Sequence, residues 1–297
     1  MNSGSIIRTD AVNAERPQTI FDSVVAATGC SSAADTLKCL RSAPFESFDN
    51  ASKAQPDFIS YNALGLSWVP RYDPKDPFYD KPESGPGAYA PDQTASVPAI
   101  FSDQEDEGTL FSLAQRNLIT VHDLIAYLRN IWPTTSPGLV SDYVATYPQD
   151  PAAGSPFGTG NANQLYPQFK RLAAAQGDAF FTLSRRQALA NYPGKAWSFL
   201  AAYFATTPIL GTPHASDLSE EYGLTPNASV GEKLQTYFIN FVNHLNPNGA
   251  SNTKWPQWTE AGRALLNISA DGTCVVKDDF REGSYDFLLQ HPEALRI

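Results

Sequence analysis

Residues 197–214 read WSFLAAYFATTPILGTPH, an apolar run that passes into a turn-rich loop ending at His214. The bulky and aromatic side chains predict a buried strand over Trp197–Phe204. A second apolar run, Val97–Phe101, passes into the acidic segment SDQEDEG of residues 102–108. Buried strands that alternate with helical segments predict an α/β layer fold. In such folds chemistry lies just beyond the carboxyl ends of the strands, so both loops are candidate sites.

Apolar spacing at helical intervals predicts the helices. They are expected at about 18–28, at 34–42, after Thr120, and over most of 163–191 with a break near Gly177. Two further strands, Ala264–Ile268 and Thr273–Lys277, flank the dipeptide Asp271-Gly272, which is typical of a hairpin turn.

Composition excludes several classes of protein. The chain has 297 residues, of which 42% are apolar and 18% charged, a balance typical of a globular domain. A formal net charge of −10 would repel phosphate backbones, so we expect no nucleic-acid partner. No apolar run reaches the roughly 18 residues of a transmembrane helix. The first five residues also lack the basic and apolar regions of a signal peptide.

The acidic segment carries four carboxylates in five positions, residues 103–107. They are typical of a solvated loop or of a cation site with oxygen ligands. The functional alternative needs one of them turned inward, toward an imidazole. We expect His122 and His244 in helices and His291 exposed near the C-terminus, whereas His214 follows a strand directly.

An imidazole held by a carboxylate is the base half of a nucleophilic triad. The third member would lie in a nucleophile elbow, G-x-S-x-G, and no such motif occurs in the sequence. The residues therefore predict a base and its orienting carboxylate without a nucleophile, and we expect no metal and no cofactor.

The three cysteines, Cys30, Cys39 and Cys274, are too few for their number to distinguish free thiols from a disulfide. Three N-x-S/T sequons are glycosylation candidates, and they begin at Asn50, Asn227 and Asn267. We expect Asn227 to be the preferred acceptor because it lies in a loop before a predicted helix, whereas Asn267 lies in a predicted strand.

Six segments, taken together and in this order, match one known family. They are Cys30–Arg41, Asp106–Phe111, Tyr147–Gly160 with Pro167–Arg171, Gly177–Arg186, Leu210–Asp217 and Trp255–Trp258. The chain resembles the type-B carboxylesterases, lipases and cholinesterases, and among them the fungal lipases of the Candida rugosa type. This family has an α/β-hydrolase fold, a mostly parallel sheet with helices.

The resemblance implies roles for particular residues. It implies Glu107 as the triad acid, His214 as the general base, and Asp217 as a second carboxylate close to the histidine. It implies a disulfide between Cys30 and Cys39, and hence an oxidising, extracellular compartment. We expect Cys274 to stay free as a small core residue of the hairpin, and an ester or lipid to be the substrate.

Residues 1–5 resemble the family's strand after the nucleophile helix. We therefore expect residues 1–297 to form one incomplete domain, the C-terminal part of the fold. The serine elbow, the oxyanion-hole glycines and the signal peptide would belong to an N-terminal half, which would be its partner. Two alternatives remain: a non-catalytic, cholinesterase-like interaction protein, and an inert truncated product.

Overall fold

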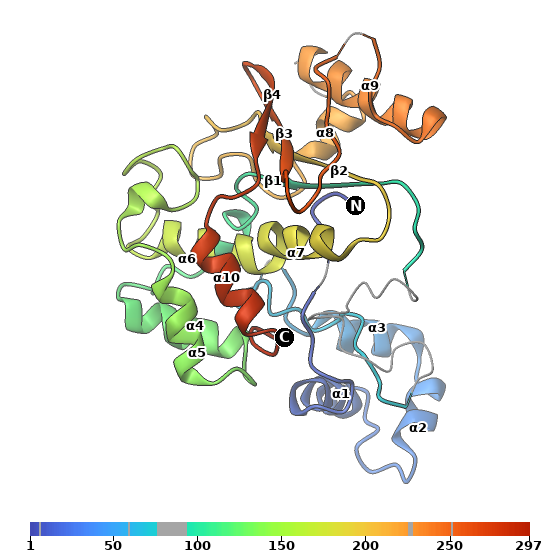
Figure 1. Ribbon diagram of the computed structural model, residues 1–297. Coiled ribbons are helices and arrows are strands. Elements are labelled where there is room, and N and C mark those ends of the chain that lie inside the picture. The colour runs from blue at the N-terminus through green and yellow to red at the C-terminus, as the bar shows by residue number, and fades with distance from the viewer. Residues whose placement is uncertain (6, 59, 76–93, 225–227, 251) are drawn as a thin grey trace.

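The structure is a computed structural model that describes residues 1–5, 7–58, 60–75, 94–224, 228–250 and 252–297 (Figure 1). The strands are β1 (Ala99–Gln104), β2 (Ala196–Ala202), β3 (Ala264–Ser269) and β4 (Gly272–Lys277). The α-helices are α1 (Glu15–Ala27), α2 (Thr36–Ser42), α3 (Phe45–Lys53), α4 (Val121–Ile131), α5 (Pro137–Ala145), α6 (Phe169–Gly177), α7 (Leu183–Asn191), α8 (Asp217–Glu221), α9 (Ala228–His244) and α10 (Glu282–Gln290). Shorter turns are the 3-10 helices η1 (Leu110–Ser112) and η2 (Pro151–Ala153) and the π-helix η3 (Asp178–Thr182).

The sheet is mixed, and its strands lie in the order β1-β2-β3-β4. Strands β1, β2 and β3 are parallel, whereas β4 pairs with β3 as an antiparallel hairpin, as the Asp271-Gly272 turn predicts. All seven residues of β2 are buried, as expected for a central parallel strand that is covered on both faces.

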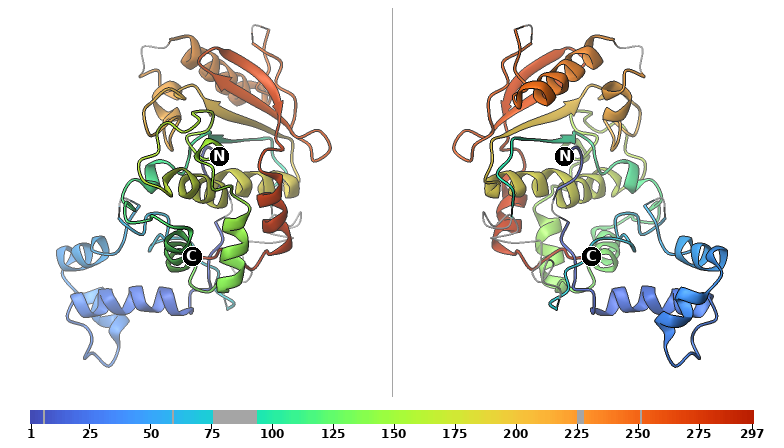
Figure 2. Two further views of the ribbon diagram at one scale, coloured as in Figure 1. Left: turned by 90° about the vertical axis from the view of Figure 1, so that its left-hand side faces the viewer. Right: turned by 90° about the vertical axis from the view of Figure 1, so that its right-hand side faces the viewer.

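Helices cover the two faces of the sheet (Figure 2). On one face Trp197 and Phe199 of β2 pack into a cluster with Leu234 of α9. On the other face Phe101 of β1 packs with Leu189 of α7. Successive side chains of a strand point to opposite faces of the sheet, so neighbouring residues pack against different helices. The fold is therefore the predicted α/β arrangement.

The N-terminal residues lie beside the free edge of β1. Asn2 forms a single parallel bridge with Ser102, in which the Ser3 N–H donates to the Ser102 carbonyl at 2.8 Å. The Ser102 N–H in turn donates to the Met1 carbonyl at 3.1 Å. Residues 1–5 thus take the position of a neighbouring strand, although only one residue is paired.

A larger apolar cluster lies beneath the sheet. It joins α4, α5, α6, η3 and α10 through side chains such as Leu128, Val140 and Leu288. Helices α1 to α3 stand apart at the lower end of the molecule, around a small cluster of their own that includes Val24 and Cys30 (Figure 2).

Several boundaries differ from the sequence predictions. Strand β1 continues through Gln104, so the first part of the acidic segment is strand, because its backbone is paired with both β2 and Asn2. Strand β2 ends at Ala202, and the Phe204 N–H donates to the Thr212 hydroxyl at 3.0 Å instead of continuing the ladder.

The helical stretch predicted from residue 163 begins only at Phe169. Pro167 disfavours helical backbone at the residue before it, so the preceding residues form turns. The predicted break near Gly177 is the π-helix η3, which joins α6 to α7 without an intervening loop.

Candidate active site

The loops after β1 and β2 meet at the carboxyl ends of these two parallel strands. The Asp106 N–H donates to the Thr212 carbonyl at 3.0 Å, and Asp106 and Pro213 form a parallel bridge. This pairing extends the sheet by one residue beyond the strands and brings the acidic segment next to the loop that carries His214.

Glu107 and His214 are in direct contact. The Oε2 atom of Glu107 lies 2.7 Å from Nδ1 of His214. The Glu107 side chain is 1% exposed and the His214 side chain 29% exposed, so the carboxylate is enclosed while the imidazole reaches solvent. Among the described residues, no other carboxylate bonds to this imidazole, and its Nε2 has no hydrogen-bond partner.

Backbone contacts fix the Glu107 carboxylate. Its Oε1 atom accepts a hydrogen bond from the Gln104 N–H at 2.8 Å, which leaves Oε2 for the imidazole. The following residue, Gly108, lies against α6, where a Cβ atom would come 1.9 Å from the carbonyl oxygen of Ala173. Glycine at position 108 therefore permits the close approach of the loop to α6.

Asp106, which directly precedes Glu107, holds the loops together instead of contacting the histidine. Its Oδ1 atom accepts hydrogen bonds from the Ser155 hydroxyl at 2.7 Å and the Phe157 N–H at 2.9 Å. Its Oδ2 atom accepts the Thr212 N–H at 2.9 Å. The prediction of a solvated acidic loop is therefore wrong, since Asp103, Asp106 and Glu107 are all 1% exposed.

Gly211 allows the Asp106 carboxylate to bind the histidine loop. Its φ angle is +60°, and a Cβ atom there would lie 2.1 Å from Oδ2 of Asp106. A glycine two residues before Pro213 therefore allows the histidine loop to close over the Asp106 carboxylate.

Two aromatic rings pack against the His214 ring. The ring centroids of Phe111 and Phe181 lie 5.2 Å and 4.9 Å from that of the imidazole. Phe181 comes from the π-helix η3, a rare local structure that is frequent at functional sites. Asp178 at the start of η3 is ion-paired with Arg281 and accepts the Tyr147 hydroxyl at 2.9 Å.

Two opposing effects set the protonation of His214. Burial is the largest single effect and lowers the pKa of the imidazole, but the hydrogen bond and the charge of Glu107, together with other nearby carboxylates, raise it overall. The charge of Asp217 raises the pKa of His214 further. Asp217 is buried at the start of α8, where burial and the charge of Glu107 raise its own pKa. The site therefore stabilises the imidazolium form.

A buried ionic cluster supports the sheet beneath this site. Arg185 of α7 bonds to Asp103 of β1 and, at 2.8 Å, to Asp278. Arg186 bonds to the same Asp278 at 3.0 Å. Arg185 therefore joins α7 to β1, and Arg185 and Arg186 together join α7 to Asp278.

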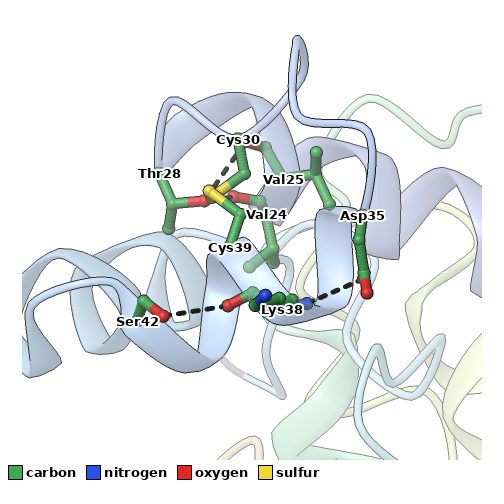
Figure 3. The surroundings of a disulfide bond; sticks show 8 residues. All are labelled: Val24, Val25, Thr28, Cys30, Asp35, Lys38, Cys39 and Ser42. Atoms are coloured by element: carbon green, nitrogen blue, oxygen red, sulfur yellow. Dashed lines mark hydrogen bonds between the residues drawn. A yellow bond between two sulfur atoms is a disulfide. The ribbon is translucent and has the colours of Figure 1, made fainter.

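The structure contains the disulfide that the family resemblance implies. Cys30 and Cys39 are bonded with an S–S distance of 2.04 Å (Figure 3). Cys274 is free, but the expectation that it packs in the core is wrong. It is exposed because β4 is the outermost strand, and no side chain of β4 is fully buried.

The remaining candidates occupy varied positions. Asn50 is exposed on α3, Asn267 is partly buried on β3, and Asn227 lies outside the described residues. His122 and His244 are exposed helix residues, whereas His291, expected to be exposed, is half-buried against Phe287.

Over the described ranges no cluster of three or more His, Cys, Asp or Glu side chains could hold a metal ion. No helix in the described part of the chain has both the length and the apolar character needed to span a membrane.

The sheet, its helices and the strand-end site define an α/β-hydrolase fold, and solved structures support this fold. The crystal structure of EstA from Aspergillus niger superposes with a TM-score of 0.76 at 21% identity, covering 99% of this chain and 58% of that chain. A PNB esterase structure superposes with a TM-score of 0.70 at 17% identity, covering 97% of this chain and 56% of that one.

The chain belongs to the carboxylesterase family, whose model matches residues 1–288. It is 42% identical over 306 residues to a secreted triacylglycerol lipase, LIP1, of Gibberella zeae, covering 100% of this chain and 51% of the relative. It is 40% identical over 300 residues to Lipase 5 of Diutina rugosa, covering 98% of this chain and 53% of the relative. The chain thus spans about half the length of the curated relatives it matches.

Proposed function

We propose that this chain supplies the acid, Glu107, and the general base, His214, of a Ser-Glu-His triad in a carboxylic-ester hydrolase. The observation that carries the proposal is the 2.7 Å contact between the enclosed Glu107 carboxylate and His214 Nδ1. This contact leaves Nε2 as the ring nitrogen for the nucleophile, and it stabilises the positive charge that the base acquires.

The proposed reaction has two steps. In the first, His214 Nε2 takes the proton of a serine hydroxyl as its oxygen attacks the ester carbonyl carbon, and the imidazolium then protonates the departing alcohol. In the second, His214 takes a proton from water as the water oxygen attacks the acyl carbon, and the imidazolium then returns this proton to the serine oxygen as the bond between the acyl carbon and that oxygen breaks, which releases the carboxylic acid and the free serine. Glu107 holds the imidazole in orientation throughout, while the charge of Asp217 lies nearby.

We propose that the serine elbow and the oxyanion hole lie in an N-terminal half of the whole protein. The absence of G-x-S-x-G from these 297 residues and the coverage of about half of each relative support this division. The printed names of the relatives support a lipid or other carboxylic ester as substrate. The disulfide and the secreted relatives support an extracellular location.

The test joins this chain to the N-terminal portion of the 42%-identical relative, as a fused or co-produced protein. Hydrolysis of p-nitrophenyl esters should appear, and His214→Ala should reduce kcat by about 10⁶-fold and Glu107→Gln by about 10⁴-fold. Glu105→Gln serves as the matched control, because Glu105 is two residues from Glu107 and makes no contact with His214 in the structure. Full activity of the His214→Ala protein, or robust hydrolysis by this chain alone, would refute the proposal.

A further inference from the structure

The loop that carries His214 is held by a side chain on each side of the histidine. Two residues before it, the Thr212 N–H donates to Oδ2 of Asp106 at 2.9 Å. Two residues after it, the Ser216 hydroxyl donates to Oε1 of Gln104 at 3.1 Å. Asp106 and Gln104 are both buried and belong to the segment that also supplies the carboxylate on the imidazole. The backbone of the histidine is therefore tethered to the same strand end as its ring.

The tether through Asp106 is the stronger of the two. Asp106 binds both backbone groups of Thr212, because its own N–H donates to the Thr212 carbonyl at 3.0 Å. Its carboxylate also accepts the Ser155 hydroxyl and the Phe157 N–H, so three donors converge on it. Burial raises the pKa of Asp106, and these hydrogen bonds oppose that effect by stabilising the ionised form. Hydrogen bonds to a charged acceptor are stronger than those between neutral groups.

The loop around His214 has an unfavourable backbone conformation. Ile209 and Ala215 have φ angles of +69° and +65°, although neither is a glycine. Residues with a Cβ atom adopt such angles rarely, and they keep them only where surrounding contacts hold the backbone. Ala215 directly follows His214 in the chain. Loss of a tether would therefore let this backbone relax and would move the imidazole.

We propose that Asp106 is a positioning residue for the general base, with Gln104 as a second and weaker tether. This inference rests on the proposed function of His214. Asp106 acts through the backbone of Thr212 and not on the imidazole itself. It keeps Nδ1 of His214 on Glu107 and thereby directs Nε2 toward the serine.

An amide cannot replace the carboxylate of Asp106. An asparagine side chain has one oxygen atom and one NH₂ group, and the NH₂ group only donates. At the position of Oδ2 this group would face the Thr212 N–H, and at the position of Oδ1 it would face the Phe157 N–H. One backbone N–H loses its acceptor in either orientation. Asp106→Asn therefore breaks part of the tether and keeps the size of the side chain.

The NMR signal of the proton on His214 Nδ1 tests the proposal in this chain without any esterase activity, because it reports the hydrogen bond to Glu107. Asp106→Asn and Ser155→Ala should both shift this signal and lower the pKa of His214. Ser155→Ala changes no charge, so its effect can come only through the position of the loop.

Asp278→Asn is the matched control for a loss of stability alone. Asp278 is also buried, and its carboxylate bonds to Arg185, Arg186 and Trp258. The variant should unfold at lower urea concentration and leave the Nδ1 signal of His214 unchanged. A purely structural role of Asp106 would give the same result in Asp106→Asn, and that result would overturn the proposal. If Asp106→Asn does not fold, an unchanged signal in Ser155→Ala would overturn it instead.

Kinetics of the joined protein provide the second readout. Asp106→Asn should lower kcat by about 10²-fold with little change in KM, the effect of a catalytic group misplaced by about 1 Å. Ser216→Ala, which removes the tether to Gln104, should lower kcat less. An unchanged kcat in Asp106→Asn would overturn the positioning role and leave the triad intact. An inactive joined protein with the natural sequence would contradict the proposed function, and the positioning role would fall with it.

Discussion

Replacing Glu107 by Gln should lower the pKa of His214 by about 1–3 pH units, because an opposite charge within a few ångströms shifts a pKa by that amount. The contact of 2.7 Å and the 1% exposure of the carboxylate place this pair in the range where the effect is large. Burial of the imidazole remains in the variant, and burial lowers the pKa. The pKa of His214 should therefore be lower in the variant than in the natural sequence, and the charges of Asp217 and Asp103 should still oppose the effect of burial.

The assay is an NMR titration of the chain labelled with ¹³C-histidine, in which His214→Ala identifies the resonance. The four histidines include three remote ones, which report any general change in the protein. Asp217→Asn should lower the pKa of His214 less than Glu107→Gln does, because Glu107 has the larger influence. Glu105→Gln should leave it nearly unchanged. An unaltered pKa of His214 in Glu107→Gln would refute the electrostatic coupling of the pair.

The same pair predicts a pH dependence of stability. The pKa of His214 is raised in the folded chain, so its stabilising effect is complete below the unfolded-state pKa and is lost as pH rises through the folded-state pKa. Denaturant unfolding at a series of pH values should show this loss in the natural sequence, and a weaker one in Glu107→Gln. An equal pH dependence in the two proteins would contradict the reasoning.

Three further predictions concern the scaffold. Gly211→Ala should destabilise the chain by about 1–3 kcal/mol in urea unfolding, since it adds both a clash and an unfavourable positive φ; Gly29→Ala, with a positive φ but open space, should cost less, and equal costs would argue against the clash. Cys30→Ser should lower the free energy of unfolding by about 2–3 kcal/mol, the chain-entropy value for a loop of about ten residues. Unchanged unfolding of the natural sequence after its disulfide is reduced would contradict this prediction. In a secretory host, peptide mapping should find a higher glycan occupancy at Asn227 than at Asn267, and a higher occupancy at Asn267 would contradict this prediction.

The contact between Glu107 and His214 was predictable because strand-end residues of neighbouring parallel strands converge. The choice of Glu107 as the proposed acid came from the family resemblance, whereas periodicity left Glu105, Asp106 and Glu107 open. The role of Asp106 was not visible in sequence, because its partners Ser155 and Phe157 lie about fifty residues away. Hydrogen bonds between such distant segments depend on the tertiary fold, which no local sequence pattern encodes.

The π-helix η3 and the exposure of Cys274 were also beyond local patterns. Gly177 indicated a break in the helix, but residues 178–182 gave no sign that the break would be a π-helix that carries Phe181 against His214. Val275 and Val276 suggest a buried strand around Cys274, but burial there depends on whether another element covers β4. Tertiary context, not intrinsic preference, decided both cases.

The most direct measurement of the proposed triad is the intact mass of the natural protein after reaction with a fluorophosphonate ester. Such a reagent phosphonylates a serine that an adjacent histidine activates. We predict one covalent adduct, on a serine of a G-x-S-x-G segment outside these 297 residues, in a protein that also contains Glu107 and His214. An adduct on a serine within residues 1–297, or a natural protein that consists of this chain alone and does not react, would contradict the triad.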